Sequence, residues 1–368
     1  MAANGSSRMD ISYVYSSSAS YSFDITSVLN GGIDKKNEFY DLLLLGLLSF
    51  IGVLGNAGLL LSVCRSARLR TSANILLTNL ATGDLLYILI SAPFFVEHEL
   101  HPNWQYGTTL CKLINAGEIT AQGVCVLSLT ALSIERYAVL VKGSAVRRLS
   151  RRYRGWLSIF AIWVLSLFIA LPVFVLADTT DNRCDYLPVD EDVTKVYEVG
   201  RVLLLYVLPM FTIACFYTCI AKTLFSSAGQ FARESQPGVR HFSARKRLAF
   251  TVLVIALFFG LFWMPYYLHV VLFRFNPYFV NHDSAEMFRR LYYFAALSNS
   301  CLNPWVVYVM SSTYRAILVG FLTCRKEISS STTSLSRYPL DRMECKVVCE
   351  SYTRRSYIQP KSSRVSEV

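Results

Sequence analysis

Three acids and one arginine lie inside long apolar stretches of this sequence. Glu135 and Arg136 are adjacent in LSLTALSIERYAVLV, Asp84 interrupts NLATGDLLYILI, and Glu118 lies in LINAGEIT. An adjacent acid and arginine can form an ion pair in a low-dielectric interior, and changing that pair would release Arg136 for another partner. Arg136 could instead extend toward lipid headgroups. Because charges in apolar surroundings are costly, each of these residues is a candidate functional site.

The composition indicates what surrounds these charges. Of the 368 residues, 53% are hydrophobic and only 17% are charged, whereas soluble domains average roughly 25% charged residues. Apolar stretches long enough to cross a bilayer as helices recur along the chain. Their hydrophobic pattern is helical or featureless and never alternating, which argues against a membrane barrel of strands. The seven predicted spans cover residues 41–64, 72–96, 109–140, 155–177, 197–225, 248–273 and 291–310.

The basic residues predict the orientation of these spans. Lys and Arg resist translocation, and they gather in the loops after the first, third and fifth spans. This places the N-terminus outside the cell and the C-terminus in the cytosol of a multi-pass plasma-membrane protein. The net charge of +11 is divided among these loops, so we expect no binding of nucleic acid.

The chain divides into three predicted regions, namely an extracellular tail (1–38), a membrane domain (39–324) and a disordered cytosolic tail (325–368). Asn4 begins a glycosylation sequon in the outer tail. The segment STYRAILVGFLTC places apolar residues on one helical face, which predicts a short amphipathic helix along the membrane. Cys324 at its end is a predicted palmitoylation site.

Other polar residues and prolines also lie within the spans. Asn56, Asn299, Ser300 and Asn303 could meet Asp84 around a water molecule or an ion. Prolines inside helices remove a hydrogen bond and create bends that a bundle tolerates. Pro265 and Pro304 suggest hinges in the sixth and seventh spans, and Trp263 would be a bulky rotor beside the first hinge.

These features together resemble the rhodopsin-like G-protein-coupled receptors, over about residues 41–324. Cys111 and Cys184, the two of ten cysteines in outer segments, match the loop disulfide of that family. The remaining matching motifs are Gly55-Asn56, NLATGD with Asp84, Glu135-Arg136-Tyr137, Trp163, Pro209, Tyr217, Phe259 with FWMP, and Asn303-Pro304 with Tyr308. The resemblance implies an all-α membrane protein, a seven-transmembrane helix bundle with a short amphipathic eighth helix, and no enzyme activity.

The resemblance also implies a mechanism. An agonist in the outer half would shift Trp263 and Phe259 against Pro209 and Val126, and the sixth span would swing outward. Tyr217 and Tyr308 would turn inward, and Arg136 would leave Glu135 for a heterotrimeric G protein. The set of Asp84, Asn299 and Ser300 resembles the sodium pocket of the family. Cys125 stands at the position where a serine often completes that pocket. No other cofactor is expected.

The third and seventh spans are similar to those of bombesin, endothelin and CCHamide-type peptide receptors. This implies a neuropeptide ligand and, by analogy, a calcium-mobilising G protein. Basic groups near the outer helix ends could hold the peptide's carbonyl or acidic groups, or could face headgroups or pair with loop acids. Aromatic side chains and one histidine could line the same pocket. These candidate pocket residues are Arg201, Arg274, Arg289, Arg290, Tyr266 and His269.

Glu118 leaves two interpretations open. It could bind a cationic group of the ligand, which suggests the alternative of a receptor with a small amine-like ligand. It could also pair internally with one of the arginines.

The cytosolic tail suggests further partners. Phosphorylation of a Ser/Thr run would add dense negative charge and recruit arrestin. The terminal Ser366-Glu367-Val368 resembles a PDZ ligand. The predicted phosphorylation sites are Ser329, Ser330, Ser331, Thr332, Thr333 and Ser334.

Overall fold

The protein is described by a computed structural model that covers residues 25–66, 69–101, 103–141, 148–180, 183–185, 187, 192–231, 238–275 and 282–322. Side chains are not described for 25–38, 142–152, 154, 180, 183, 185, 225–231, 238–245, 273–275, 282–286 and 321–322. The chain forms two compact units, 1–325 and 326–368, and the second lies outside the described residues.

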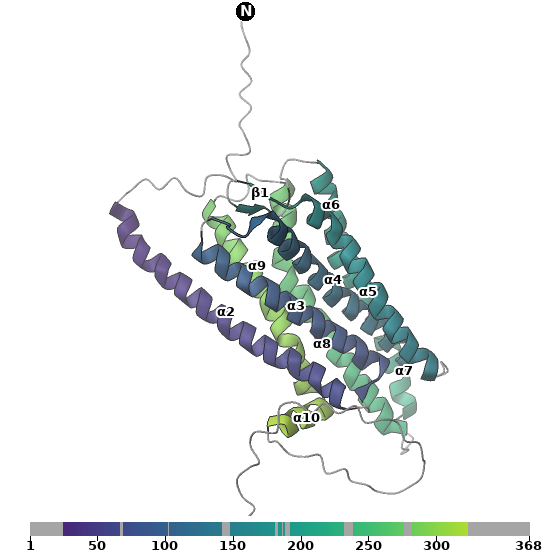
Figure 1. The fold of residues 1–368 in the computed structure, drawn as a ribbon. Coiled ribbons are helices and arrows are strands. Elements are labelled where there is room, and N and C mark those ends of the chain that lie inside the picture. Colours follow the sequence, from purple (N-terminus) through teal and green to yellow (C-terminus); the bar gives the residue numbers. More distant parts are fainter. Residues whose placement is uncertain are drawn as a thin grey trace, which may run out of the picture. The chain divides into compact units, whose positions relative to one another are not determined.

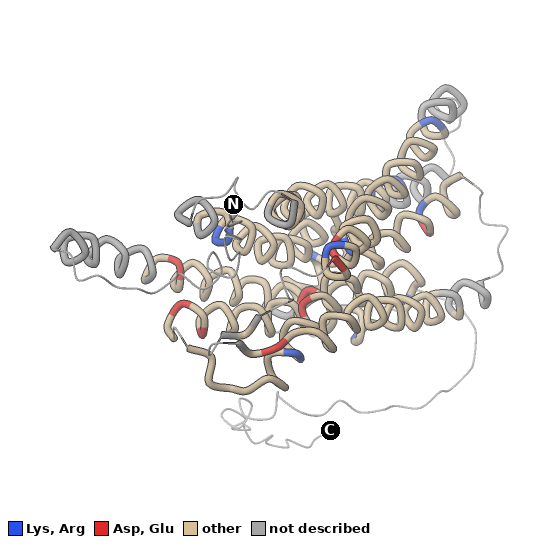
Figure 2. Tube along the Cα trace, turned by 90° about the horizontal axis from the view of Figure 1, so that it is seen from above, with Lys and Arg blue, Asp and Glu red and all other residues tan. Residues whose placement is uncertain are grey.

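The first unit is a bundle of long helices that run side by side (Figure 1). Lys, Arg, Asp and Glu are sparse along the described helices (Figure 2). The helices are α2 (Ile25–Arg65), α3 (Ser72–Leu100), α4 (Gly107–Leu140), α5 (Arg148–Leu176), α6 (Asp192–Val202), α7 (Leu208–Phe231), α8 (Gly238–Phe275), α9 (His282–Met310) and α10 (Ser312–Leu322).

The predicted spans correspond to these helices, several of which begin well before the apolar stretch, with α8 starting at Gly238 and α9 at His282. Helix α2 begins at Ile25, before the expected start at Asp41, because a helix can continue beyond the apolar stretch that lipid requires. The fifth span is not one regular helix. A π-helical turn, η2 (Leu203–Val207), joins α6 to α7, directly before Pro209. Proline has no N–H for the preceding turn, which favours such a local widening.

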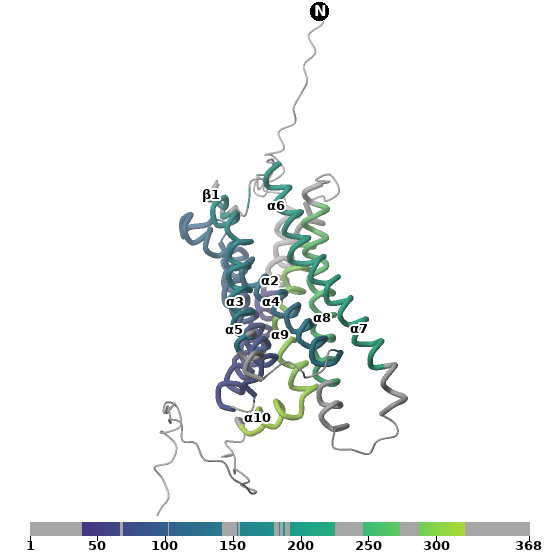
Figure 3. The backbone as a smooth tube through the Cα atoms, turned by 90° about the vertical axis from the view of Figure 1, so that its right-hand side faces the viewer, coloured from purple at the N-terminus to yellow at the C-terminus, as the bar shows by residue number. Residues whose placement is uncertain are grey.

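Six of the described helices are apolar and long enough to cross a membrane, and α9 is not among them. Helix α9 nevertheless lies within the bundle, against α2, α3 and α8 (Figure 1). The outer surface of the bundle suits lipid, since Phe160, Phe168 and Phe211 are 68%, 69% and 67% exposed. Beyond α9, the predicted amphipathic helix is present as α10, which runs crosswise at the end of the bundle (Figure 3).

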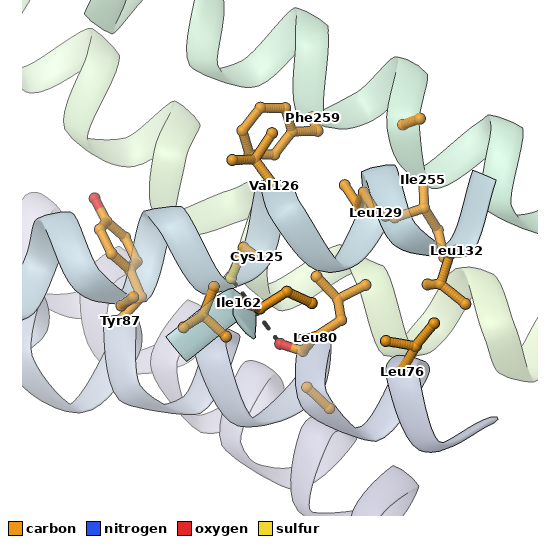
Figure 4. Packing of buried hydrophobic residues seen from close by; sticks show 14 of the residues in the cluster. Leu76, Leu80, Tyr87, Cys125, Val126, Leu129, Leu132, Ile162, Ile255 and Phe259 are labelled. Atoms are coloured by element: carbon orange, nitrogen blue, oxygen red, sulfur yellow. Dashed lines mark hydrogen bonds between the residues drawn. The ribbon is translucent and has the colours of Figure 1, made fainter. Parts of the chain in front are cut away.

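Helix α4 is central, because it packs against α3, α5, α7 and α8. Its buried side chains interlock with those of α3 and α8 (Figure 4). Gly123 allows α5 to approach closely, since a Cβ at this position would lie 2.8 Å from Ser166 Oγ and 3.3 Å from Ser166 Cα.

A short β-hairpin, which was not predicted from the sequence, follows the fourth span. Strands β1 (Asp178–Thr180) and β2 (Arg183–Asp185) pair antiparallel, with Thr179 opposite Cys184. The Cys111–Cys184 disulfide is formed, with the Cα atoms 5.5 Å apart. It ties the hairpin to the outer start of α4, as expected from the sequence.

We predict that Gly123→Val lowers the thermal stability of the protein in detergent by about 2 kcal/mol, because the added methyl groups overpack the α4–α5 contact. The measurement is the midpoint of thermal unfolding.

The matched control is Gly46→Val, since no atom lies within 4 Å of a Cβ at Gly46. Equal midpoints for the two variants would contradict this account of the α4–α5 contact.

Candidate functional site

Asp84 lies on α3 in the middle of the bundle and contacts side chains of two other helices. Its side chain is fully buried, and Asn303 Nδ2 donates a hydrogen bond of 2.9 Å to Asp84 Oδ2. Cys125 Sγ donates to the other carboxylate oxygen at 3.4 Å, and the Ser300 side chain lies near this carboxylate. The predicted cluster is therefore assembled by α3, α4 and α9.

Asn56 extends this cluster to α2 through hydrogen bonds to backbone carbonyls. Its Nδ2 donates to the carbonyl oxygens of Gly52 at 3.0 Å and Ser300 at 2.9 Å. Gly55, beside it, lets α9 approach, because a Cβ there would lie 2.6 Å from Pro304 Cγ. The backbone of α9 is thus held by the Gly55-Asn56 pair.

The cluster contains buried oxygens that could receive a cation. Asn56 Oδ1, Asn299 Oδ1 and Asn303 Oδ1 are buried without a hydrogen-bond partner in the described part of the chain. Carbonyl and carboxylate oxygens are the ligands that hard cations prefer. The residues present therefore fit a sodium ion, with the soft sulfur of Cys125 as the least suitable neighbour.

The half of the bundle near the C-terminal end of α4 contains the Glu135–Arg136 pair. Arg136 is buried, and its Nη2 lies 3.7 Å from Glu135 Oε2. Tyr217 on α7 donates its hydroxyl to the carbonyl of Ala249 on α8 at 2.8 Å. Tyr137 contacts Phe216 with ring centroids 5.0 Å apart. The predicted switch residues of the third and fifth spans therefore lie at the contacts between α4, α7 and α8.

Tyr308 and Arg247 make further contacts at this end. The Tyr308 hydroxyl donates to the carbonyl of Gly55 at 3.2 Å. Arg247 Nη2 donates to Ser312 Oγ at 2.9 Å, which joins α8 to the start of α10. This second bond was not anticipated, because the two residues are distant in sequence and neither lies in a recognised motif.

An aromatic group occupies the middle of α8. Phe259 is fully buried and points toward Val126 of α4 (Figure 4). Its ring lies 5.8 Å from Trp263, and Trp263 lies 5.4 Å from Tyr87 of α3. Pro265 follows within the same helix. Because Trp263 contacts Tyr87 of α3 and also Phe259, which faces α4, a rotation of Trp263 would displace side chains at both helices.

The arginines at the outer helix ends pair with acids on helices. Arg201 is buried, and its Nε and Nη2 donate to Glu198 Oε2 at 2.9 and 2.5 Å. Arg289 pairs with Glu99. Arg290 pairs with Asp41 at 2.5 Å and with Glu99 at 3.3 Å. The described acids that pair with these three arginines lie on α2, α3 and α6, and most of the loop acids lie outside the described residues.

Aromatic rings complete this outer layer. The Arg201 guanidinium lies 5.2 Å from the centre of the Tyr266 ring. His269 lies 5.0 Å from Tyr292, which contacts Tyr266 at 5.3 Å. Tyr266 and His269 therefore belong to one aromatic cluster between α8 and α9, next to Arg201.

Glu118 does not pair with an arginine in the described part of the chain. Instead, Ser91 Oγ donates a hydrogen bond of 2.6 Å to Glu118 Oε1. The Tyr293 hydroxyl donates to the carbonyl of the same Ser91 at 2.7 Å. Among the described side chains Glu118 therefore belongs to a link between α3, α4 and α9, while the side chain of Arg274, another partner considered for it, is not described.

Several predicted sites cannot be placed. The helix at Arg274 is described, but its side chain is not. The glycosylation, palmitoylation, phosphorylation and PDZ predictions all lie outside the described residues, at Asn4, Cys324, Ser329–Ser334 and Ser366–Val368.

Most of the acids and hydroxyl groups that pair with the predicted arginines and with Glu118 were not predicted from the sequence. Glu198 had a local signal, because it stands three residues before Arg201, a helical ion-pair spacing. Ser91, Glu99 and Asp41 had none, since their contacts depend on how the helices pack.

Comparison with known protein families agrees with this geometry. A model of the family described as "7 transmembrane receptor (rhodopsin family)" matches residues 55–308. The chain belongs to this receptor family. It is therefore a multi-pass receptor of the plasma membrane, and α9 is the seventh span. Members of the family are signalling receptors and not enzymes.

The receptor is also similar to two curated proteins over most of its length. It is 31% identical to the bombesin receptor subtype-3 of Ovis aries over 307 residues, which cover 80% of this chain and 77% of the relative. It is 32% identical to the [Phe13]-bombesin receptor of Bombina orientalis over 283 residues, covering 72% and 71% of the two chains.

For the receptor, we predict that Glu198→Gln reduces stability by about 3 kcal/mol, because it removes a carboxylate that compensates a buried guanidinium. The measurement is the thermal midpoint in detergent, together with the amount at the cell surface.

The double variant Glu198→Gln, Arg201→Met is the control, since removing both charges is far less costly than removing one. A double variant less stable than Glu198→Gln would contradict the role given to this pair.

Proposed function

We propose that this receptor binds a neuropeptide between the outer ends of its helices and activates a heterotrimeric G protein. The observation that carries the proposal is the similarity to two bombesin receptors over most of both chains. The receptor's N-terminus would be extracellular and its C-terminus cytosolic, as the basic loops favour.

The outer half offers suitable chemistry for a peptide. Trp263 Nε1 and the Tyr267 hydroxyl are buried donors without a partner in the described part of the chain. Backbone carbonyls of a peptide are natural acceptors for such donors. Tyr266, Tyr292 and His269 provide aromatic surface nearby.

Activation would act on the contacts at the cytosolic end. A ligand that moves Trp263 would shift α8 at the Pro265 hinge. Outward movement of α8 would break the Tyr217–Ala249 and Arg247–Ser312 bonds, which join α8 to α7 and α10. Arg136 would then leave Glu135 for the G protein, which we propose is of the calcium-mobilising kind.

Other partners are proposed from motifs in the sequence. Asp84, Asn299 and Ser300 would hold an allosteric sodium ion, which would supply a positive charge beside the carboxylate. The tail would bind arrestin after phosphorylation at Ser329–Ser334, Cys324 would carry palmitate, and Asn4 would carry a glycan.

A small amine-like ligand is the second candidate. The observation in its favour is Glu118, which faces the interior with a serine and without a basic partner among the described residues. Amines that activate the receptor in place of peptides would support it.

We predict that cells expressing the receptor release intracellular calcium when challenged with bombesin-like peptides. Arg136→Ala should abolish this response while labelled peptide still binds, because Arg136 lies at the cytosolic end, far along α4 from Glu118.

The control is the amount of each protein at the surface. A calcium response to peptide that survives Arg136→Ala would contradict the role of Arg136. A receptor that answers amines and none of the peptides would contradict the proposed ligand class.

A further inference from the structure

The hydroxyl of Tyr206 ties the π-helical turn η2 to the middle of α8. It donates a hydrogen bond of 2.8 Å to the carbonyl of Gly260. The two spans approach closely here, because a Cβ at Gly260 would lie 2.7 Å from Met210 Cε of α7. A side chain of the fifth span therefore reaches the backbone of α8 where the absence of a Cβ leaves room for α7.

Gly260 stands in the turn of α8 that Pro265 weakens. Proline has no N–H to donate to the carbonyl four residues earlier, which here is the carbonyl of Leu261. The backbone next to Gly260 therefore loses one of its helical bonds, and the Tyr206 hydroxyl adds a bond from outside the helix. Trp263 lies in the same turn, so the Tyr206 bond fixes the backbone at the hinge on which the proposed movement of α8 depends.

The π-helical turn explains how Tyr206 reaches α8. The Leu208 N–H donates to the carbonyl of Leu203, five residues earlier, whereas a regular α-helix bonds over four residues. A turn closed over five residues brings side chains that are five apart toward the same face. Arg201 and Tyr206 are five apart, and both lie against Tyr267 of α8. The Arg201 guanidinium carbon is 6.0 Å from the centre of that ring, and the Tyr206 and Tyr267 ring centres are 4.6 Å apart.

The two contacts of this face with α8 differ in strength. Arg201 is buried and pairs with Glu198, three residues before it, and a buried ion pair is costly to disturb. The outer part of the face is therefore fixed. The contact between Tyr206 and Gly260 is a single neutral hydrogen bond, whose loss changes an equilibrium constant about fivefold. A moving α8 can give up this bond while the ion pair stays intact.

We infer that Tyr206 is a positioning residue that holds α8 in its resting form by donating to the Gly260 carbonyl beside the Pro265 hinge. The inference rests on the proposed function, since it takes the movement of α8 as the activating step. It adds the contact that restrains this step before any ligand binds. Loss of the Tyr206 hydroxyl frees the hinge and shifts the equilibrium toward the outward form of α8.

The test compares Tyr206→Phe with Tyr197→Phe in the full-length receptor without ligand. Both substitutions remove only a hydroxyl from the fifth span. The control is matched, because the Tyr197 hydroxyl also donates to a backbone carbonyl, at 2.9 Å, but to that of Ile169 on α5. Variants are compared at equal amounts of folded receptor.

Two readouts separate the movement of α8 from its consequence. The first is the distance between spin labels on Cys64 of α2 and on Lys246→Cys of α8, two exposed positions. The remaining cysteines outside the disulfide are replaced by serine. The second readout is basal nucleotide exchange on a panel of heterotrimeric G proteins.

We expect Tyr206→Phe to raise the ratio of the outward to the resting form about fivefold over the wild type, the effect of one neutral hydrogen bond. Basal nucleotide exchange should rise with this ratio and should disappear when Arg136→Ala is added. Tyr197→Phe should leave both readouts at the wild-type level, because its bond joins α6 to α5 and not to α8.

Unchanged or smaller values of both readouts in Tyr206→Phe would overturn the inference. An equal rise in Tyr197→Phe would also overturn it, because a general loosening of the fifth span would then be the cause. An outward shift in Tyr206→Phe alone, without exchange on any G protein, would support the restraint on α8 and contradict the proposed coupling. The spin-label distance needs neither a ligand nor a G protein, so failure of the inference and failure of the proposed function are distinguishable.

Discussion

Asp84 places a carboxyl group in a region where lipid offers no hydrogen-bond partner. An unsatisfied polar group costs several kcal/mol in such surroundings, so partners must come from neighbouring helices. Asn303 and Cys125 supply them directly, and Asn56 binds the backbone at Ser300. The resulting bonds tie α2, α3, α4 and α9 together. Helix α9 is not apolar enough to be a candidate span by composition alone, and two of these bonds hold it to α2 and α3.

The need to pair buried polar groups also determines the contacts at the two ends of the helix bundle, and these contacts differ in kind. At the outer end, arginines and acids compensate each other across helices, with Arg290 reaching both Asp41 of α2 and Glu99 of α3. Such pairs hold the helix ends at fixed positions around the ligand region. At the cytosolic end, single hydrogen bonds join α8 to its neighbours through Tyr217 and Arg247. A displacement of α8 away from α7 and α10 would break both of these bonds.

Much of this arrangement could be predicted from the sequence. Length and hydropathy indicated the spans, although α9 alone does not reach the hydropathy of a membrane-spanning helix. The polar residues within the spans indicated the Asp84 cluster, because lipid penalises such residues wherever they stand. The two outer cysteines paired as expected. The partners of the arginines and of Glu118 were not predictable, since Ser91, Glu99 and Asp41 meet them only through packing between distant segments. The π-helical turn before Pro209 and the β1–β2 hairpin also escaped prediction, because a proline or two threonines permit several local conformations.

The central claim is that ligand binding at the outer end moves the cytosolic end of α8 away from the bundle. The most direct measurement is the distance between spin labels on the native exposed Cys64 of α2 and on Lys246→Cys of α8, with the other free cysteines replaced by serine. The account predicts that an activating peptide lengthens this distance. An unchanged distance under a peptide that releases calcium in cells would contradict it.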